Sequence, residues 1–456
     1  MGDRALAWLR EHQLADGSWG AKAPTYYHDR LICTLAAMIA LAERGQSRDL
    51  LRWRRAELAL DRISKGLLAD PAGNTVGFEM IVPTLLNEAK SLGIIHQQRD
   101  DVLNWLTRHR AAKLAALPDG MINRFVTVAF SAEMVGSDGL HLLDLENLQE
   151  ANGSVSYSPA ATAFFALHVR PNDEAALNYL REVAFDSAVP YVAPIDVFER
   201  AWTLWNLAIT GAVDSRLSVV CQPHLDFLEA EWCPGKGIAS VAGLTCRDGD
   251  ATSLVYHVLA HYGRAVDLEG VLHYEEDDLF RCYALEANPS ISTNVHVLAA
   301  LRQAGLEVEH PSVTKVIRFL FRAQTLQLFW LDKWHSSPYY PTAHAVVACA
   351  GYADWLIDDA VYWILETQNA DGSWGYYGPT AEETAYCLQA LVTWKRHGNS
   401  VPNDVLKRGV AWLVEHTEPP YPPLWIGKCL YCPILVVRSA ILSALMLVDA
   451  EGLLCE

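Results

Sequence analysis

A thirteen-residue segment occurs twice in this chain, once near each end. The first copy, from Trp8, reads WLREHQLADGSWG, and the second, from Trp363, reads WILETQNADGSWG. Self-similarity of this kind is typical of repeat architectures. Each copy reads as a helix followed by a glycine turn, in which the Trp ring and the Gln amide can cap or clasp neighbouring helices. The chain is therefore expected to be built from repeated helical units.

A second pattern supports this expectation, because small and hydroxyl residues repeatedly begin Ala- and Leu-rich stretches. From residue 251 onward these starts lie roughly 40–60 residues apart, which fits one helical hairpin per repeat. Strand-like alternation is rare, so the predicted class is all-α, with the helix pairs closing into two α–α barrel domains. A Pro-containing stretch at 188–200 predicts domains at 1–195 and 196–456. The stretches are 34–43, 158–169, 251–263, 292–305, 342–353, 380–394 and 438–448.

Composition excludes several classes of protein. The 456 residues are 51% hydrophobic and carry a formal net charge of -18, so no basic footprint for nucleic acid is present. The sequence has no run of 18 apolar residues and no signal-peptide pattern, which predicts a cytoplasmic protein without a membrane span. The ten cysteines are scattered apart from Cys429 and Cys432, and we interpret them as reduced core thiols.

The segment CRDGDATSL, residues 246–254, places two carboxylates one residue apart, at Asp248 and Asp250. Taken alone, this step is most simply a surface turn that precedes a helix capped at Thr252. The alternative is an acid site. A carboxylic acid beside a second carboxylate can stay protonated, because like charges at short range resist joint ionisation.

Long stretches of the chain resemble class II diterpene cyclases, and among them the actinobacterial halimadienyl (tuberculosinyl) diphosphate synthases. The Gln…Gly-x-Trp elements also occur in squalene–hopene cyclases. The resemblance covers almost the whole chain, although the Tyr-Asp-Thr-Ala-Trp segment expected before the first such element is not found. The stretches that carry it are 74–94, 146–164, 191–202, 289–301, 331–344, 380–387 and 418–432.

The resemblance implies an acid motif, Asp-x-Asp-Asp, at positions 248–251. In that family the middle Asp protonates an alkene, which makes Asp250 the expected donor and Asp248 its support. An isolated alkene is a very weak base, so its acid must be neutral, oriented and shielded from water. Ala251 replaces the last acid of the motif. Because halimadienyl relatives also lack an acid there, Ala251 need not abolish activity; the alternative is an engineered, inactivating change.

The resemblance also implies where the diphosphate binds. Lys333, in LDKW, and Lys113 match diphosphate-binding lysines on the two domains, and Lys428 is a weaker candidate. The chain contains no Asp-Asp-x-x-Asp motif that would ionise the diphosphate, so this group is expected to be retained. Mg²⁺ is expected to assist, as in the family. Of the acidic cluster that the family uses upstream, only Asp70 and Glu79 are found in this chain.

The product is constrained by two further positions. In plant ent-copalyl diphosphate synthases a His–Asn pair holds the water that removes the final proton, and here Phe130 and Tyr191 occupy those positions. Neither can readily serve as that base, which favours continued hydride and methyl shifts. Trp334 and Thr252 are predicted to lie against the substrate. We have no assignment for the terminal base.

The sequence thus predicts cyclisation of geranylgeranyl diphosphate to a bicyclic, rearranged diterpenyl diphosphate of halimadienyl type. One alternative is a copalyl-type product, or a drimenyl-type product from farnesyl diphosphate. An alternative of another class is a non-catalytic α–α barrel subunit that binds a prenyl chain. Expected partners are the prenyl diphosphate and a downstream phosphatase or class I synthase, while the oligomeric state is left open.

Overall fold

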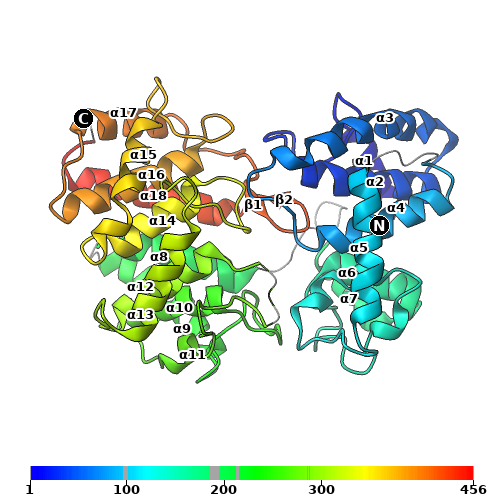
Figure 1. The fold of residues 1–456 in the computed structure, drawn as a ribbon, viewed down its shortest axis with the longest axis horizontal. Coiled ribbons are helices and arrows are strands. Elements are labelled where there is room, and N and C mark those ends of the chain that lie inside the picture. The colour runs from blue at the N-terminus through cyan, green and yellow to red at the C-terminus, as the bar shows by residue number, and fades with distance from the viewer. Residues whose placement is uncertain are drawn as a thin grey trace. The chain divides into compact units, whose positions relative to one another are not determined.

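The computed structural model describes residues 2–95, 101–184, 195–211, 215–284, 286 and 288–454, and nearly all of its regular structure is helical (Figure 1). The longer helices in the first half are α1 (Gly2–Glu11), α2 (Tyr27–Arg44), α3 (Leu50–Gly66), α4 (Phe78–Ser91), α5 (Asp101–Ala116), α6 (Pro159–Phe164), α7 (Glu174–Glu182), α8 (Asp196–Ala208) and α9 (Ser215–Glu231). Those in the second half are α10 (Gly249–His261), α11 (Glu269–Leu272), α12 (Ile291–Gln303), α13 (Pro311–Ala323), α14 (Tyr339–Cys349), α15 (Asp358–Glu366), α16 (Ala381–Arg396), α17 (Asn403–Val414) and α18 (Ile434–Ala450).

Short elements connect these helices. The 3₁₀ turns are η1 (Ser47–Asp49), η2 (Leu67–Ala69), η3 (Thr127–Val135), η4 (Leu140–Leu142) and η6 (Asp354–Leu356), and η5 (Phe165–Val169) is a π-helical turn. Strands β1 (Trp425–Ile426) and β2 (Leu430–Tyr431) form an antiparallel pair in which Trp425 is opposite Tyr431.

The chain divides into two compact units. Unit 1 contains Met1–Pro194 together with Gly243–Cys246 and Pro423–Tyr431, and unit 2 contains the rest. The sequence predicted a division into two continuous segments, whereas here two short pieces of the second segment belong to unit 1. The longer piece carries β1 and β2, and its backbone is bound to unit 1 by hydrogen bonds such as Leu430 N–H to the Asp29 carboxylate, at 2.8 Å.

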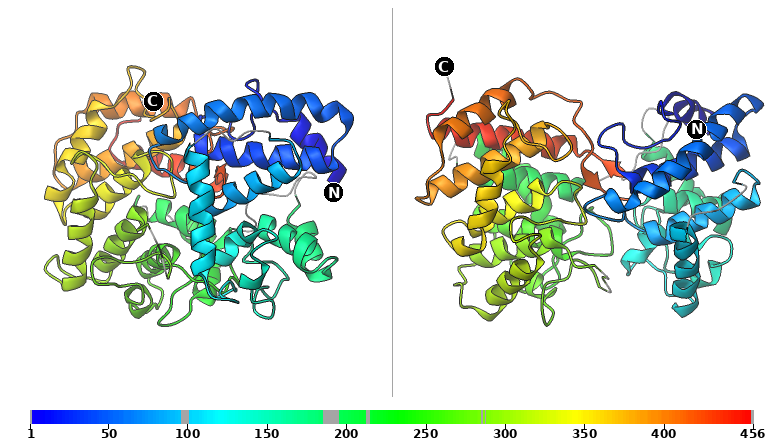
Figure 2. Two further views of the ribbon diagram at one scale, coloured as in Figure 1. Left: turned by 45° about the vertical axis from the view of Figure 1, so that its right-hand side comes forward. Right: turned by 45° about the horizontal axis from the view of Figure 1, so that its top comes forward.

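Unit 2 is a closed ring of inner helices. Contacts run from α8 to α10, α12, α14, α16 and α18, and then back from α18 to α8. The remaining helices pack outside this ring, for example α13 on α12 and α17 on α16 and α18 (Figure 2). The inner helices are rich in small and β-branched apolar residues, which allows their axes to approach closely. The expected all-α class with α–α barrels is confirmed.

Unit 1 consists of packed helices that surround a hydrophobic core of their own. Helix α2 contacts α1, α3 and α4, while α4 also contacts α5 and η3. Leu31, Leu35 and Met38 of α2 are fully buried in this core, together with Phe78 at the start of α4. The spacing of these apolar residues along α2 follows the helical period, which is why this helix is central.

The duplicated segment makes the same contacts in both units. The side-chain amide of Gln13 donates to the carbonyl four residues later and to a carbonyl of α3, and Gln368 bonds in the same way to α17. The indole N–H groups of Trp19 and Trp374 each donate to a carbonyl ten residues earlier, at 2.7 Å. Each copy therefore ties a glycine turn to two helices.

None of the helices in the described ranges combines the length and the hydropathy that a membrane-spanning helix requires.

Candidate active site

The two acids of the sequence motif, Asp248 and Asp250, lie at the buried N-terminus of α10. Asp248 is the N-cap: its Oδ1 accepts the backbone N–H of Ala251 at 2.6 Å. Asp248 is 2% exposed and Asp250 is 9% exposed. The interpretation of this step as a surface turn capped at Thr252 is therefore wrong, because both acids are buried and the cap is Asp248.

Burial makes Asp248 an unusual acid. Its Oδ2 has no hydrogen-bond partner within the described ranges. Burial, followed by repulsion from Asp250, raises the pKa of Asp248 to about 7, although the backbone N–H of Ala251 acts in the opposite direction. A large fraction of Asp248 is therefore protonated near neutral pH, which limits the negative charge beside Asp250.

Asp250 is held by a histidine of the next inner helix. Its Oδ1 lies 2.6 Å from Nδ1 of His296, which sits in the middle of α12. The His296 side chain is 1% exposed, and the Asp250 side chain is 13% exposed. With Oδ1 engaged, Oδ2 of Asp250 is the oxygen available to another group. This contact fixes the acid in one orientation.

The start of α12 is set by Asp332 of the LDKW motif. Its carboxylate accepts the backbone N–H groups of Ile291 and Ser292 and the hydroxyls of Ser290 and Ser292. These bonds satisfy donors that a helix N-terminus leaves without intrahelical partners. Because His296 lies little more than one turn into α12, this cap also determines where the His296 ring meets Asp250.

A second histidine and several aromatic rings surround His296. Its Nε2 lies 3.0 Å from Nδ1 of His344 on α14. Trp202 meets the His296 ring edge-on, and the indole of Trp202 donates to the Tyr340 hydroxyl at 2.9 Å. Trp205 stacks on His344 with ring centroids 4.3 Å apart. Two further aromatic residues, Trp202 and Tyr340, therefore pack around this histidine pair.

Thr252 has a structural contact in place of the predicted substrate contact. It is fully buried, and its hydroxyl bonds to both the N–H and the C=O of Ile238. Its hydroxyl is thus engaged by the backbone, and the substrate contact of Thr252 stays a prediction. Trp334 is half-buried beside Tyr283, and its indole N–H has no partner in the described part of the chain.

The two predicted diphosphate lysines are both paired with carboxylates. Lys333 in unit 2 contacts Glu286 and the carbonyl of Asn288, and its ammonium lies over the Trp334 ring. Burial raises the pKa of Glu286 despite the attraction of Lys333. Lys113 in unit 1 donates to Glu79 at 2.6 Å, and its side chain is 44% exposed.

Lys428 and Phe130 lie together inside unit 1. The Lys428 ammonium bonds to Glu133 at 2.5 Å and to the Ser158 hydroxyl at 2.7 Å, and it lies 4.7 Å from the Phe130 ring centre. Lys428 is 8% exposed, and burial lowers its pKa. These contacts give Lys428 a buried pairing role. Tyr191 lies outside the described residues.

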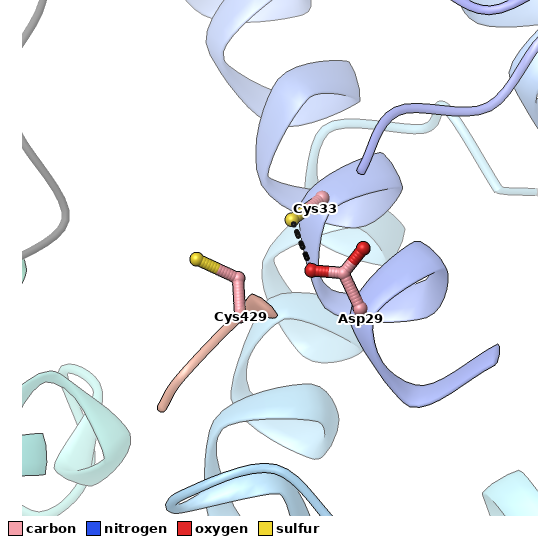
Figure 3. Close-up of side chains that lie close together, drawn as sticks. All are labelled: Asp29, Cys33 and Cys429. Atoms are coloured by element: carbon pink, nitrogen blue, oxygen red, sulfur yellow. Dashed lines mark hydrogen bonds between the residues drawn. The ribbon is translucent and has the colours of Figure 1, made fainter. Parts of the chain in front are cut away.

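The predicted metal positions do not form one site. The Asp70 carboxylate accepts the ring and backbone N–H of His28, and Glu79 is bound by Lys113 and by His109 at 3.3 Å. Among the described residues the cluster whose ligand atoms all lie within 4.8 Å is a different one, shown in Figure 3: Asp29, Cys33 and Cys429. Its thiols do not suit Mg²⁺, which prefers oxygen ligands.

His296 and His344 are the residues that sequence reasoning missed. A signal was present, because HVLA occurs at 257–260 and again at 296–299, in two helices of the repeat. A histidine in the middle of an apolar inner helix is expected to bond to a polar partner. The sequence does not reveal that this partner is Asp250, which is 46 residues away.

Comparison with known proteins now identifies the family. The squalene-hopene cyclase C-terminal domain family matches residues 280–421. A type B diterpene cyclase of Mycobacterium tuberculosis is 46% identical over 99% of this chain and 93% of its own length. A labda-7,13-dienyl diphosphate synthase of Streptomyces clavuligerus is 31% identical over 98% of this chain and 86% of its own. The structure of ent-copalyl diphosphate synthase from Streptomyces platensis matches with a TM-score of 0.76 at 32% identity, covering 97% of this chain and 91% of that chain.

The chain therefore belongs to the class II diterpene cyclases. The resemblance noted from the sequence, the helical fold and the enzyme class, an intramolecular lyase or isomerase, are confirmed. Enzymes of this class begin cyclisation by protonation from an aspartate.

Proposed function

We propose that this chain cyclises geranylgeranyl diphosphate to a bicyclic, rearranged diterpenyl diphosphate of halimadienyl type, with the diphosphate retained. The observation that carries the proposal is the buried Asp250 at the start of α10, hydrogen-bonded to His296 at 2.6 Å. A buried and oriented carboxylic acid is the group that alkene protonation requires.

In this proposal Asp250 donates from Oδ2, because Oδ1 is engaged by His296. Asp248 lies beside the donor, and at this short range a charge on one carboxylate disfavours ionisation of the other. The proton adds to the terminal alkene of the prenyl chain, and a tertiary carbocation forms that the internal alkenes then attack. Aromatic faces stabilise such cations by about 2 kcal/mol per contact in a dry site.

Lys333 and Lys113 are each proposed as a cation that binds diphosphate oxygens. Each lysine is paired with a carboxylate, Glu286 or Glu79, so binding exchanges a carboxylate partner for a diphosphate oxygen. The high charge of the diphosphate favours this exchange. Burial raises the pKa of Glu286, and departure of Lys333 would raise it further, because the attraction of the lysine acts in the opposite direction.

A copalyl-type product is the second candidate. A relative from Streptomyces anulatus, 32% identical over 97% of this chain and 84% of its own length, is a copalyl diphosphate synthase. The halimadienyl type is favoured because Phe130 and Tyr191 stand at the positions that the resemblance assigns to the His–Asn pair of plant ent-copalyl enzymes, and neither can readily act as a base.

One assay separates these candidates. The protein is incubated with geranylgeranyl and farnesyl diphosphates, the products are dephosphorylated and analysed by mass spectrometry, and Asp250→Asn is compared. We expect a rearranged bicyclic alcohol from the longer substrate and none from the variant. Asp226→Asn is the matched control, since this carboxylate pairs with Arg264 on the surface. A product formed equally by Asp250→Asn would refute the assigned role, and a folded protein without product would favour the non-catalytic subunit.

Mg²⁺ assistance stays a prediction. Because Asp70 and Glu79 are engaged elsewhere, we derive no step through the metal. Assays with EDTA and with added Mg²⁺ test the requirement. A downstream phosphatase or class I synthase would consume the retained diphosphate. The cytoplasmic location is likewise a prediction.

A further inference from the structure

Three side chains of metal-ligating types converge within unit 1, and the proposed cyclisation uses none of them. Asp29 and Cys33 lie one turn apart on α2, and Cys429 comes from the turn between β1 and β2 (Figure 3). One carboxylate oxygen and the two sulfurs all lie within 4.8 Å of one another. The fold therefore builds a mixed oxygen and sulfur cluster from two segments that are far apart in the sequence.

The Asp29 carboxylate is oriented by backbone groups on both sides. Its Oδ2 accepts the N–H of Ala21 at 2.7 Å, and its Oδ1 accepts the N–H of Leu430 at 2.8 Å. Asp29 is 1% exposed. Leu430 directly follows Cys429, so the bond that orients the carboxylate also brings the Cys429 sulfur close to it. Outer hydrogen bonds of this kind are what hold a carboxylate ligand in position at a metal.

The spacing of the ligand atoms fits a tetrahedral ion. Sγ of Cys33 lies 3.6 Å from Oδ1 of Asp29, to which it donates its hydrogen. In a tetrahedral zinc site, a sulfur about 2.3 Å and an oxygen about 2.1 Å from the metal lie about 3.6 Å apart. Two such sulfurs lie about 3.8 Å apart, which is inside the 4.8 Å limit of the cluster. A metal ion can therefore take the place of the thiol hydrogen with little movement of either side chain.

The donor set selects the class of ion. Thiolates favour soft and borderline metals, whereas Mg²⁺ and Ca²⁺ require oxygen ligands. Zinc accepts both thiolate and carboxylate ligands. We propose that Asp29, Cys33 and Cys429 form a binding site for a divalent cation of the zinc class. Cys33 and Cys429 are each partly exposed, so a water molecule can supply the fourth ligand.

Binding exchanges hydrogen for metal at both sulfurs. A hydrogen bond with Cys429, followed by burial, raises the pKa of the Cys33 thiol well above its usual value. Without an ion Cys33 therefore keeps its hydrogen, whereas a coordinated metal deprotonates the thiol that binds it. Two S–H bonds break, two metal–sulfur bonds form, and two protons are released to solvent.

The ion would link the segment 423–431 more firmly to unit 1. This segment already packs on Tyr26 through Ile426 and Leu430. A metal bound by α2 and by Cys429 adds a further link, and its ligands come together only in the folded chain. Binding therefore stabilises the folded protein. This consequence does not depend on which reaction the chain catalyses.

Cobalt(II) is the probe, because it replaces zinc in tetrahedral sites and its bonds to sulfur absorb in the near ultraviolet. The reduced full-length protein is freed of metal with a chelator and titrated with Co²⁺ under nitrogen. We expect a sulfur-to-cobalt band that saturates at one equivalent, is bleached by Zn²⁺ and is unaffected by excess Mg²⁺. Cys33→Ser and Cys429→Ser are each expected to weaken Co²⁺ binding by roughly tenfold or more.

Cys432→Ser is the matched control, because Cys432 is also partly exposed, shares a Cys-x-x-Cys pair with Cys429 and is outside the cluster of three. It is expected to bind Co²⁺ as the unchanged protein does, and circular dichroism checks that each variant is folded. The inference is overturned if the reduced protein shows no band, if both cluster variants keep it, or if Cys432→Ser loses it. A protein that binds no ion when reduced and only forms a Cys33–Cys429 disulfide in air overturns it too.

Two further measurements are independent of enzyme activity. Zn²⁺ is expected to raise the unfolding temperature of the unchanged protein and of Cys432→Ser by several degrees, with no such rise in Cys33→Ser or Cys429→Ser. X-ray absorption at the zinc edge is expected to show two sulfur neighbours at about 2.3 Å and oxygen neighbours at about 2.0–2.2 Å. Three or four sulfur neighbours would contradict the assigned ligands. Failure of the proposed cyclisation would leave all of these results unchanged.

Discussion

At the scale of single residues, burial rather than sequence determines how Asp248 behaves. Its pKa is raised from 3.8 to about 7 in the folded chain. The folded state therefore keeps a proton that the unfolded state has already lost between these values. Stability contributed by this group is present below pH 4 and is lost as the pH rises toward 7.

Asp248→Asn tests whether the Asp248 carboxyl lowers the stability of the folded protein as the pH rises. The amide keeps an acceptor for the Ala251 N–H and mimics the protonated acid. We expect the variant to gain roughly 1–4 kcal/mol in unfolding free energy at pH 8 relative to the unchanged protein, and little at pH 4. Urea unfolding at the two pH values measures the difference. A variant that is destabilised equally at both would contradict a raised pKa.

At the scale of elements, the cap of α12 links stability to the site. Asp332 accepts two backbone N–H groups and two hydroxyls at the start of this helix. Asp332→Ala leaves buried donors unsatisfied, and we expect a loss of roughly 2–4 kcal/mol together with a lower turnover number. Thermal unfolding and steady-state kinetics measure both effects.

Asp173→Ala, which removes the cap of another helix, is the control for Asp332→Ala. Asp173 caps α7 in unit 1 through one backbone N–H, that of Ala176, at 2.9 Å. Its loss is expected to cost about 1 kcal/mol and to leave the turnover number unchanged. Equal effects of the two substitutions would argue against a special role for the α12 cap.

At the scale of the whole molecule, the proposal assigns two lysines, Lys333 and Lys113, to the binding of diphosphate. Lys333→Met and Lys113→Met are each expected to raise KM for the prenyl diphosphate by roughly tenfold, with a smaller effect on kcat. Steady-state kinetics of the single and double variants measure this. Lys315→Met is the control, because Lys315 pairs with Glu275 in the same manner and lies outside the proposed site. Unchanged KM in both single variants would remove these lysines from substrate binding.

Several parts of the fold could be predicted from sequence because their causes are local. The duplicated Gln and Trp bond to carbonyls four and ten residues away, so a short segment contains most of what it needs. Hydroxyl and small residues at the helix starts function as caps for a similar reason, as Ser290 does when its side chain accepts the N–H of Thr293. Helical class, repeat and acid motif all follow from such short-range patterns.

Other features depend on how distant helices align. His296 meets Asp250 only because α10 and α12 are neighbours in a closed ring with a particular register, and His344 joins them from α14. The segment 423–431 belongs to unit 1 because its strand pair bonds there, although the chain on both sides belongs to unit 2. No local pattern encodes either result.

The sequence by itself therefore determined that this chain is a helical repeat protein with a paired-acid motif of a class II cyclase. The tertiary structure alone decided what surrounds that acid: the histidine that bonds to Asp250, and the burial that raises the pKa of Asp248. The physical reason is that a hydrogen bond and a desolvation energy depend on what surrounds a group, and that surrounding comes from residues far away in the chain.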